Sequence, residues 1–198
     1  DVGFENAFQA YSDGELPNVS YQDFSGRGFF LSGSGEHGTA CAEIVHDVAP
    51  EAELILLRAE SLVDLVSAIV WSVDNDVDVI SHSLGWVTEG IGDGNGPAAY
   101  LADYAAANGI LFVDAAGNKT AGQIYNGLWA DTDSDGWHDF ASGVEVIELD
   151  QVAALDVITV SLVWDDWSKG FATESTNDYD LHLVRADAFG NWSIVASS

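Results

Sequence analysis

Residues 52–84 read AELILLRAESLVDLVSAIVWSVDNDVDVISHSL, and this stretch decides the fold. The apolar run at 52–59 is typical of a buried strand. Residues 61–75 carry apolar side chains at helical spacing, and residues 77–84 form a second strand-like run. A strand, a helix and a strand joined by short connections predict a parallel sheet covered by helices.

The same alternation continues along the chain. Residues 97–108 predict a second helix, which Gly109 ends, and residues 110–116 predict the next strand. Ser61 is the predicted N-cap of the first helix, because a serine hydroxyl accepts a hydrogen bond from a free amide there. We therefore expect residues 1–128 to form one α/β unit with a parallel sheet flanked by helices.

The chain changes character after about residue 128. Four short runs alternate in polarity or are rich in β-branched residues, and Asp, Ser, Gly and Asn separate them. These runs are residues 144–149, 156–164, 178–184 and 192–197. The pattern is typical of an antiparallel β-sandwich, so residues 129–198 are predicted to be a second unit.

Composition excludes several classes of protein. Five Lys and Arg oppose 33 Asp and Glu, and the net charge of −28 excludes nucleic acid and anionic membranes as partners because both would be repelled. Apolar residues make up 47% of the chain, too many for a disordered acidic tail. No apolar run approaches the ~18 residues of a membrane span, and a single Cys excludes an internal disulfide.

Composition also bears on the setting of the protein. The chain begins at Asp1 and contains no Met, which predicts a processed or cropped piece of a longer protein. Two Lys among so many carboxylates suggest saline or calcium-containing surroundings. We therefore expect a secreted or cell-surface location.

Three polar residues stand where an α/β protein carries its chemistry. Asp1 opens DVGF, His37 lies in GSGEHGTACAEIVHDVAP, and Asn118 lies in LFVDAAGNKT directly after a strand-like run. Reactive groups of open parallel sheets gather beyond the carboxyl ends of the strands. Taken singly, each residue also has a structural explanation: a solvated loop carboxylate, a polar helix start and a turn amide.

In this order the three segments resemble the subtilisin-like serine proteases. Val48-Ala49-Pro50, Val79-Ile80 and Ser83-Leu84-Gly85 extend the resemblance over about 118 residues. It implies that Asp1 orients His37, that His37 is the general base and acid, and that Asn118 donates to the oxyanion. It also implies that Ser83, Leu84 and Gly85 form the edge that pairs with a polypeptide substrate.

The nucleophile of that family is missing from these residues. The chain has no Gly-Thr-Ser-Met-Ala-like segment, so this piece alone is predicted not to hydrolyse peptides. Either the β-rich unit is inserted before a serine that lies beyond Ser198, which we favour, or the nucleophile has been lost. A lost nucleophile would leave a non-catalytic calcium-binding module for adhesion or assembly on a degenerate protease fold.

Cys41 is predicted to be structural, and His82 and His182 are predicted to be structural or surface residues and not ligands. Cys41 lies one helical turn after His37 on the same helical face. A thiol in this position points poorly toward a substrate, so we expect Cys41 to pack beneath the imidazole and not to act as a nucleophile. The resemblance implies sensitivity to mercurials there. His82 and His182 alternate with apolar neighbours, and no zinc-ligand spacing is present.

An acidic loop at residues 130–140 reads ADTDSDGWHDF. Asp131, Asp133 and Asp135 alternate before Gly136, a spacing that directs successive carboxylates at one hard cation. The Trp137 carbonyl and Asp139 are further candidate ligands. The loop is therefore predicted to bind calcium, and a solvated acidic turn is the alternative.

Residues 158–184 resemble, more weakly, the prepeptidase C-terminal type of β-sandwich that accompanies secreted peptidases. Asp165, Asp166, Asp178 and Asp180 would form a second cation site if the two strands that carry them are neighbours. Solvent-facing charges at strand ends are the simpler explanation, and we favour it.

Overall fold

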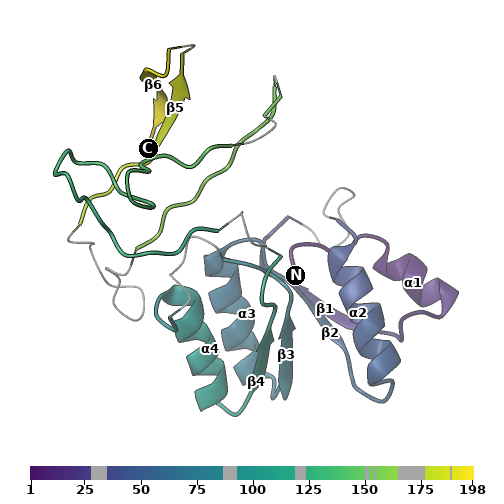
Figure 1. The fold of residues 1–198 in the computed structure, drawn as a ribbon. Helices are drawn as coiled ribbons and strands as arrows, with labels where there is room; N and C mark the ends of the chain where they lie inside the picture. Colours follow the sequence, from purple (N-terminus) through teal and green to yellow (C-terminus); the bar gives the residue numbers. More distant parts are fainter. Residues whose placement is uncertain are drawn as a thin grey trace. The chain divides into compact units, whose positions relative to one another are not determined.

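The computed structural model describes residues 1–27, 35–86, 93–118, 124–149, 152–153, 155–164, 177–187 and 189–198 (Figure 1). Its elements are α1 (Ala7–Asp13), β1 (Ser20–Asp23), α2 (His37–Val48), β2 (Ile55–Arg58), α3 (Leu62–Asp74), β3 (Val79–His82), α4 (Pro97–Ala107), β4 (Leu111–Asp114), β5 (His182–Ala186) and β6 (Trp192–Ser197). Packing divides the chain into two units. The first comprises Asp1–Ala116 and Ser161–Ser198, and the second comprises Gly117–Val160.

Strands β1 and β2 form a parallel pair in which Ser20 lies opposite Ile55 and Asp23 opposite Arg58. Helices α1 and α2 contact each other beside this pair (Figure 1). Their small and apolar faces meet β2 in one buried cluster, which contains Phe4, Ala7, Ala10, Leu16, Ala42 and Leu56. This cluster joins the N-terminal segment to the helix that begins with His37.

Strands β3 and β4 form a second parallel pair, with Val79 opposite Leu111 and His82 opposite Asp114. Helices α3 and α4 lie side by side next to it (Figure 1). The apolar stripe of α3 packs on α4 in a second buried cluster, which contains Leu65, Ile69, Leu101, Ala105 and Ile110. The predicted helices at 61–75 and 97–108 and the α/β class of the chain are thus confirmed.

Helix α3 begins at the residue that its sequence predicts. The Ser61 hydroxyl accepts a hydrogen bond from the Asp64 amide at 3.2 Å, and the Asp64 carboxylate accepts one from the Ser61 amide at 3.0 Å. This reciprocal pair is a capping box, which satisfies two amides that a helix start leaves free.

Replacing Ser61 by Ala is therefore expected to lower the free energy of unfolding by about 1 kcal/mol. Chemical denaturation of the protein measures this change in the free energy of unfolding. Ser67→Ala is the matched control, because the Ser67 hydroxyl donates to the Val63 carbonyl within the same helix and supports no helix start. Equal losses in the two variants would show that the cap contributes nothing specific.

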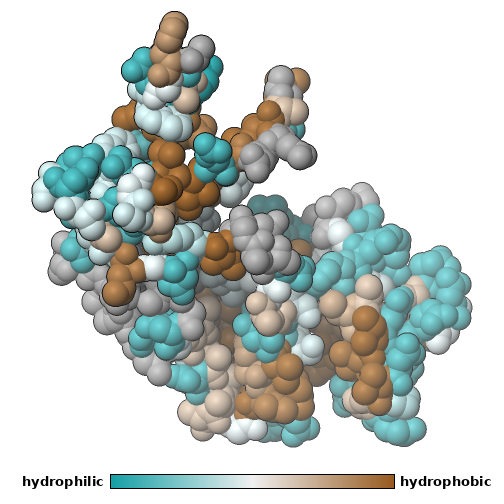
Figure 2. Space-filling model, viewed as in Figure 1, coloured by the Kyte–Doolittle hydropathy of each residue, from teal (hydrophilic) through white to brown (hydrophobic). Residues whose placement is uncertain are grey.

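The β-rich tail differs from its prediction. Residues 145–149 and 155–164 contain no strand in the described structure, and Ala141 and Val144 form an isolated antiparallel bridge. Strands β5 and β6 pair in antiparallel register with a shift between Leu183 and Val184. Strands need a partner for both their backbone groups and their apolar face. Described apolar side chains at 144–160, among them Ile147, Leu155 and Val157, are exposed accordingly, and Figure 2 shows apolar surface in this part of the second unit.

The predicted division of the chain near residue 128 stays a prediction. Composition changes near residue 128, whereas contacts divide the chain after Ala116 and again after Val160. A β-sandwich is not formed by the described residues and stays a prediction. Among these residues, no helix combines the length and the apolar character that crossing a bilayer requires.

Candidate active site

Asp1 is fixed by the edge of strand β2. Its backbone nitrogen donates to the Leu57 carbonyl at 3.0 Å, and its carbonyl accepts from the Ala59 amide at 3.0 Å. Strand β1 pairs with the opposite edge of β2, through bonds such as that from the Phe24 amide to the Arg58 carbonyl. Asp1 therefore stands beside the carboxyl end of a parallel strand, where open sheets place reactive groups.

The start of helix α2 is bound to the same segment. The Gly38 amide donates to the Gly3 carbonyl at 3.1 Å, and the Thr39 hydroxyl donates to the Glu5 carbonyl at 2.8 Å. Asn6 donates through its side chain to Glu36, the residue before His37. These bonds set the position of His37 relative to Asp1.

The two predicted catalytic side chains meet. His37 Nδ1 lies 2.7 Å from Asp1 Oδ2, so the ring donates its Nδ1 proton to the carboxylate. Asp1 Oδ1 accepts from the Val2 amide at 2.7 Å, which fixes the carboxylate plane. The Asp1 side chain is 6% exposed and that of His37 is 60% exposed. A buried carboxylate thus holds an imidazole whose other face is open to solvent.

Cys41 lies beneath that imidazole. Its sulfur is 4.0 Å from both ring nitrogens of His37, and the residue is half-buried. Asp1, His37 and Cys41 together bring one potential ligand atom each within 4.8 Å of one another. The thiol contacts the ring from within its own helix, as a packing group does.

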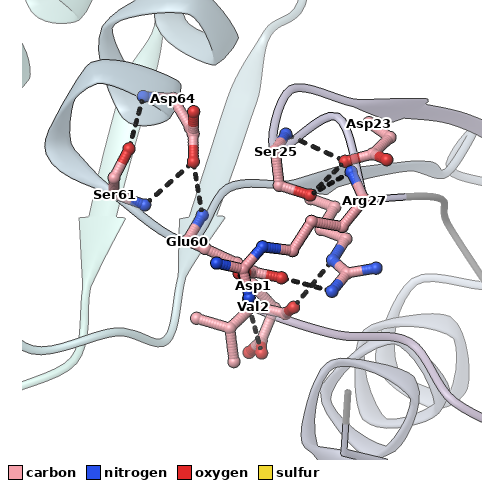
Figure 3. Close-up of polar contacts among 9 residues, drawn as sticks. Asp1, Val2, Asp23, Ser25, Arg27, Glu60, Ser61 and Asp64 are labelled. Atoms are coloured by element: carbon pink, nitrogen blue, oxygen red, sulfur yellow. Dashed lines mark hydrogen bonds and ion pairs between the residues drawn. The ribbon is translucent and has the colours of Figure 1, made fainter. Parts of the chain in front are cut away.

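A buried arginine supports the segment that carries Asp1. Arg58 is 3% exposed, its Nε donates to the Val2 carbonyl at 3.0 Å, and its guanidinium pairs with Glu60. Glu60 also pairs with Arg27 at 3.2 Å, and Figure 3 shows Glu60 and Arg27 near Asp1 and Val2. Sequence reasoning did not identify Arg58, although a cation inside the apolar run 52–59 was the available signal, since a buried charge requires partners.

The remaining predicted residues lie on separate segments. Ser83, Leu84 and Gly85 directly follow β3 in the first unit, with Ser83 and Leu84 half-buried and Gly85 exposed. Asn118 follows Gly117, whose φ of 86° allows a tight turn after β4, and it belongs to the second unit. Asp165 and Asp166 lie outside the described residues.

The acidic loop of the second unit brings three of its predicted ligands together. Carboxylate oxygens of Asp131, Asp133 and Asp135 lie within 4.8 Å of one another. Asp139 is engaged elsewhere, because its Oδ2 accepts from the amide and the hydroxyl of Thr132, both at 2.7 Å. These two bonds lower the pKa of Asp139. Trp137 donates its amide to Asp135 at 2.9 Å.

Comparison with known proteins identifies the family of the chain. The model of the subtilase family, peptidase S8, matches residues 17–196. The match includes His37 and Asn118, and Asp1 precedes it. This chain belongs to the subtilase family, whose members are serine proteases that act on polypeptides. Neither the curated proteins nor the solved structures compared with the chain contain a significant match.

Proposed function

We propose that this chain is the Asp- and His-bearing part of a secreted or cell-surface serine endopeptidase. Asp1 orients His37, His37 acts as general base and then general acid, and Asn118 donates to the oxyanion. The nucleophilic serine comes from residues outside 1–198, and the β-rich unit is an insertion before it. Residues 1–198 alone are expected to be inactive.

The observation that carries the proposal is the 2.7 Å bond between His37 Nδ1 and the buried Asp1 carboxylate. That bond fixes the proton on Nδ1 and leaves Nε2 as the base, the arrangement that a serine nucleophile requires. The burial of Asp1 strengthens its attraction for the imidazolium that forms when the serine proton is taken. The family match supports the same reaction class.

Labelling of the complete protein by a fluorophosphonate probe tests this function. The probe reacts with a serine only when the serine is activated, so rapid covalent labelling is the expected result. A folded protein that takes no label would contradict the proposal and favour the non-catalytic module for adhesion or assembly.

We further propose that Asp131, Asp133 and Asp135 bind a structural calcium ion. Oxygen ligands lie about 2.3–2.6 Å from calcium, so two ligands on opposite sides are at most about 5 Å apart. Carboxylate oxygens of the three residues lie within 4.8 Å of one another, which is compatible with that span. Asp135 and the neighbouring carboxylates raise the pKa of Glu145, so the loop has an excess of negative charge that a cation would neutralise. The Trp137 carbonyl and Asp139 stay candidate ligands, and Asp139 would have to leave Thr132 to bind.

Calcium is therefore expected to raise the melting temperature of the protein, and Asp133→Asn is expected to abolish that rise. At 100 times its dissociation constant an ion stabilises the folded state by about 2.7 kcal/mol. Asp133 is chosen because Asp131 and Asp135 also accept amides of the loop. Thermal melting with calcium or chelator at constant ionic strength provides the measurement.

Glu53→Gln is the control, because it removes one exposed charge from the first unit. Calcium should also lower the pKa of Glu145 toward its usual value, since the ion screens the carboxylates that raise it. Nuclear magnetic resonance titration of Glu145 measures that shift. A melting temperature that responds to calcium equally in Asp133→Asn and in the unmodified protein would rule out this site.

A further inference from the structure

A second acid–imidazole pair joins strands β3 and β4 next to the predicted substrate edge. His82 ends β3 and lies opposite Asp114, the last residue of β4. The His82 side chain is 5% exposed, and its Nδ1 lies 2.5 Å from Asp114 Oδ1. Ser83, Leu84 and Gly85 follow His82 directly, so the pair lies at the base of that segment.

The other ring nitrogen of His82 is also engaged. Trp86 donates its indole N–H to His82 Nε2 at 3.2 Å, and the two rings stack with an interplanar angle of 13°. Phe112 of β4 packs on the same imidazole at 5.3 Å. Asp114 accepts the proton of Nδ1, and Nε2 accepts the proton that Trp86 donates.

This geometry closes the substrate edge into a short loop. The bond between His82 and Trp86 joins the residue before Ser83 to the residue after Gly85. Asp114 fixes the tautomer of His82 in which Nε2 can accept a hydrogen bond. Strand β4, which carries Asp114, therefore supports the loop that follows β3. A loop held at both ends loses less conformational entropy when a peptide binds along it.

We propose that His82, Trp86 and Asp114 are positioning residues, which hold Ser83–Gly85 in one conformation for pairing with a peptide backbone. The ligand class is an extended peptide with several residues before the cleaved bond. This inference rests on the proposed function, because the segment acts as a substrate edge only in a protein that binds peptides. None of the three residues touches the reacting atoms.

Trp86→Phe in the complete protein provides the test, because it removes the indole N–H donor and keeps an aromatic ring, although a smaller one. Loss of one hydrogen bond predicts a KM about three- to tenfold higher for an extended peptide, with kcat changed less than twofold. The rate of fluorophosphonate labelling should stay unchanged, since that small probe does not use the edge. Trp71→Phe is the control for the loss of ring size, because Trp71 lies in α3 and its ring packs on Phe24.

Asp114 provides a rescue experiment. Asp114→Asn keeps an oxygen that accepts the Nδ1 proton and should behave as the unmodified protein does. Asp114→Ala removes that oxygen and should raise KM as Trp86→Phe does. A merely structural role would lower the melting temperature of both Asp114 variants without separating KM from kcat.

Calorimetric binding of the same extended peptide separates this inference from the proposed function. If the peptide binds, Trp86→Phe weakens its binding and no hydrolysis occurs, the positioning role stands and the protease function fails. If Trp86→Phe and Trp71→Phe bind the peptide equally, the positioning role is overturned. Failure of the unmodified protein to bind the peptide would also overturn it.

Discussion

Replacing His37 by Ala is expected to abolish fluorophosphonate labelling of the complete protein and to lower kcat for peptide hydrolysis by about 10⁶-fold. That magnitude is the one established for removing the imidazole from a subtilisin triad and is adopted here. The physical reason is that, in the proposed mechanism, His37 takes the proton of the serine as the acyl bond forms, and alanine offers no base in its place. The labelling rate and single-turnover hydrolysis measure the effect.

His46→Ala is the matched control for this prediction. His46 lies in the last turn of the same helix, so its loss removes an imidazole from α2 without touching Asp1. Labelling of His46→Ala at the unmodified rate, with none in His37→Ala, would support the assignment. Retention of activity in His37→Ala would exclude His37 as the base.

Replacing Gly38 by Ala is expected to have the second-largest effect. A Cβ atom at Gly38 would lie 2.4 Å from the Gly3 carbonyl oxygen and 2.8 Å from both Asp1 Cβ and Phe4 Cδ1. The backbone contact offers no flexible side chain that could yield, so the N-terminal segment must move away from α2. Overpacking of this kind costs about 1–3 kcal/mol of stability. A displacement of ~1 Å between catalytic groups lowers the rate by about 10²-fold.

Thermal melting and single-turnover hydrolysis measure the two effects of Gly38→Ala. Gly85→Ala is the control for stability, because a Cβ there meets no atom within 4 Å. Its melting temperature should equal that of the unmodified protein. If Gly38→Ala retains full stability and full activity, the close approach of α2 to Asp1 is wrong.

The sequence predicts the elements whose apolar spacing is regular. Helix α3 was expected at 61–75 and runs from Leu62 to Asp74, and β6 was expected at 192–197 and spans those residues. Strand β1 was not predicted, because residues 20–23 are polar and mostly exposed. Its identity comes from pairing with β2, which lies more than 30 residues further along the chain.

The site residues also divide into those that a sequence motif identifies and those that only contacts in the fold bring together. Asp1 and His37 could be identified because each lies in a motif, and the structure brings them to 2.7 Å. His82 was interpreted as structural or exposed, and its partners were missed, since Asp114 becomes its neighbour only through the β3–β4 register. Asp139 shares the alternating acidic pattern with Asp131 but contacts Thr132, a choice that spacing alone does not reveal.

The coupling between Asp1 and His37 tests the central claim most directly. We would measure single-turnover hydrolysis in the complete protein for Asp1→Ala, for His37→Ala and for the double variant. If the carboxylate acts only through the imidazole, the double variant is no slower than His37→Ala alone, because residues that act as a unit are strongly non-additive. A double variant whose loss equals the product of the two single losses would contradict the pair as the catalytic unit.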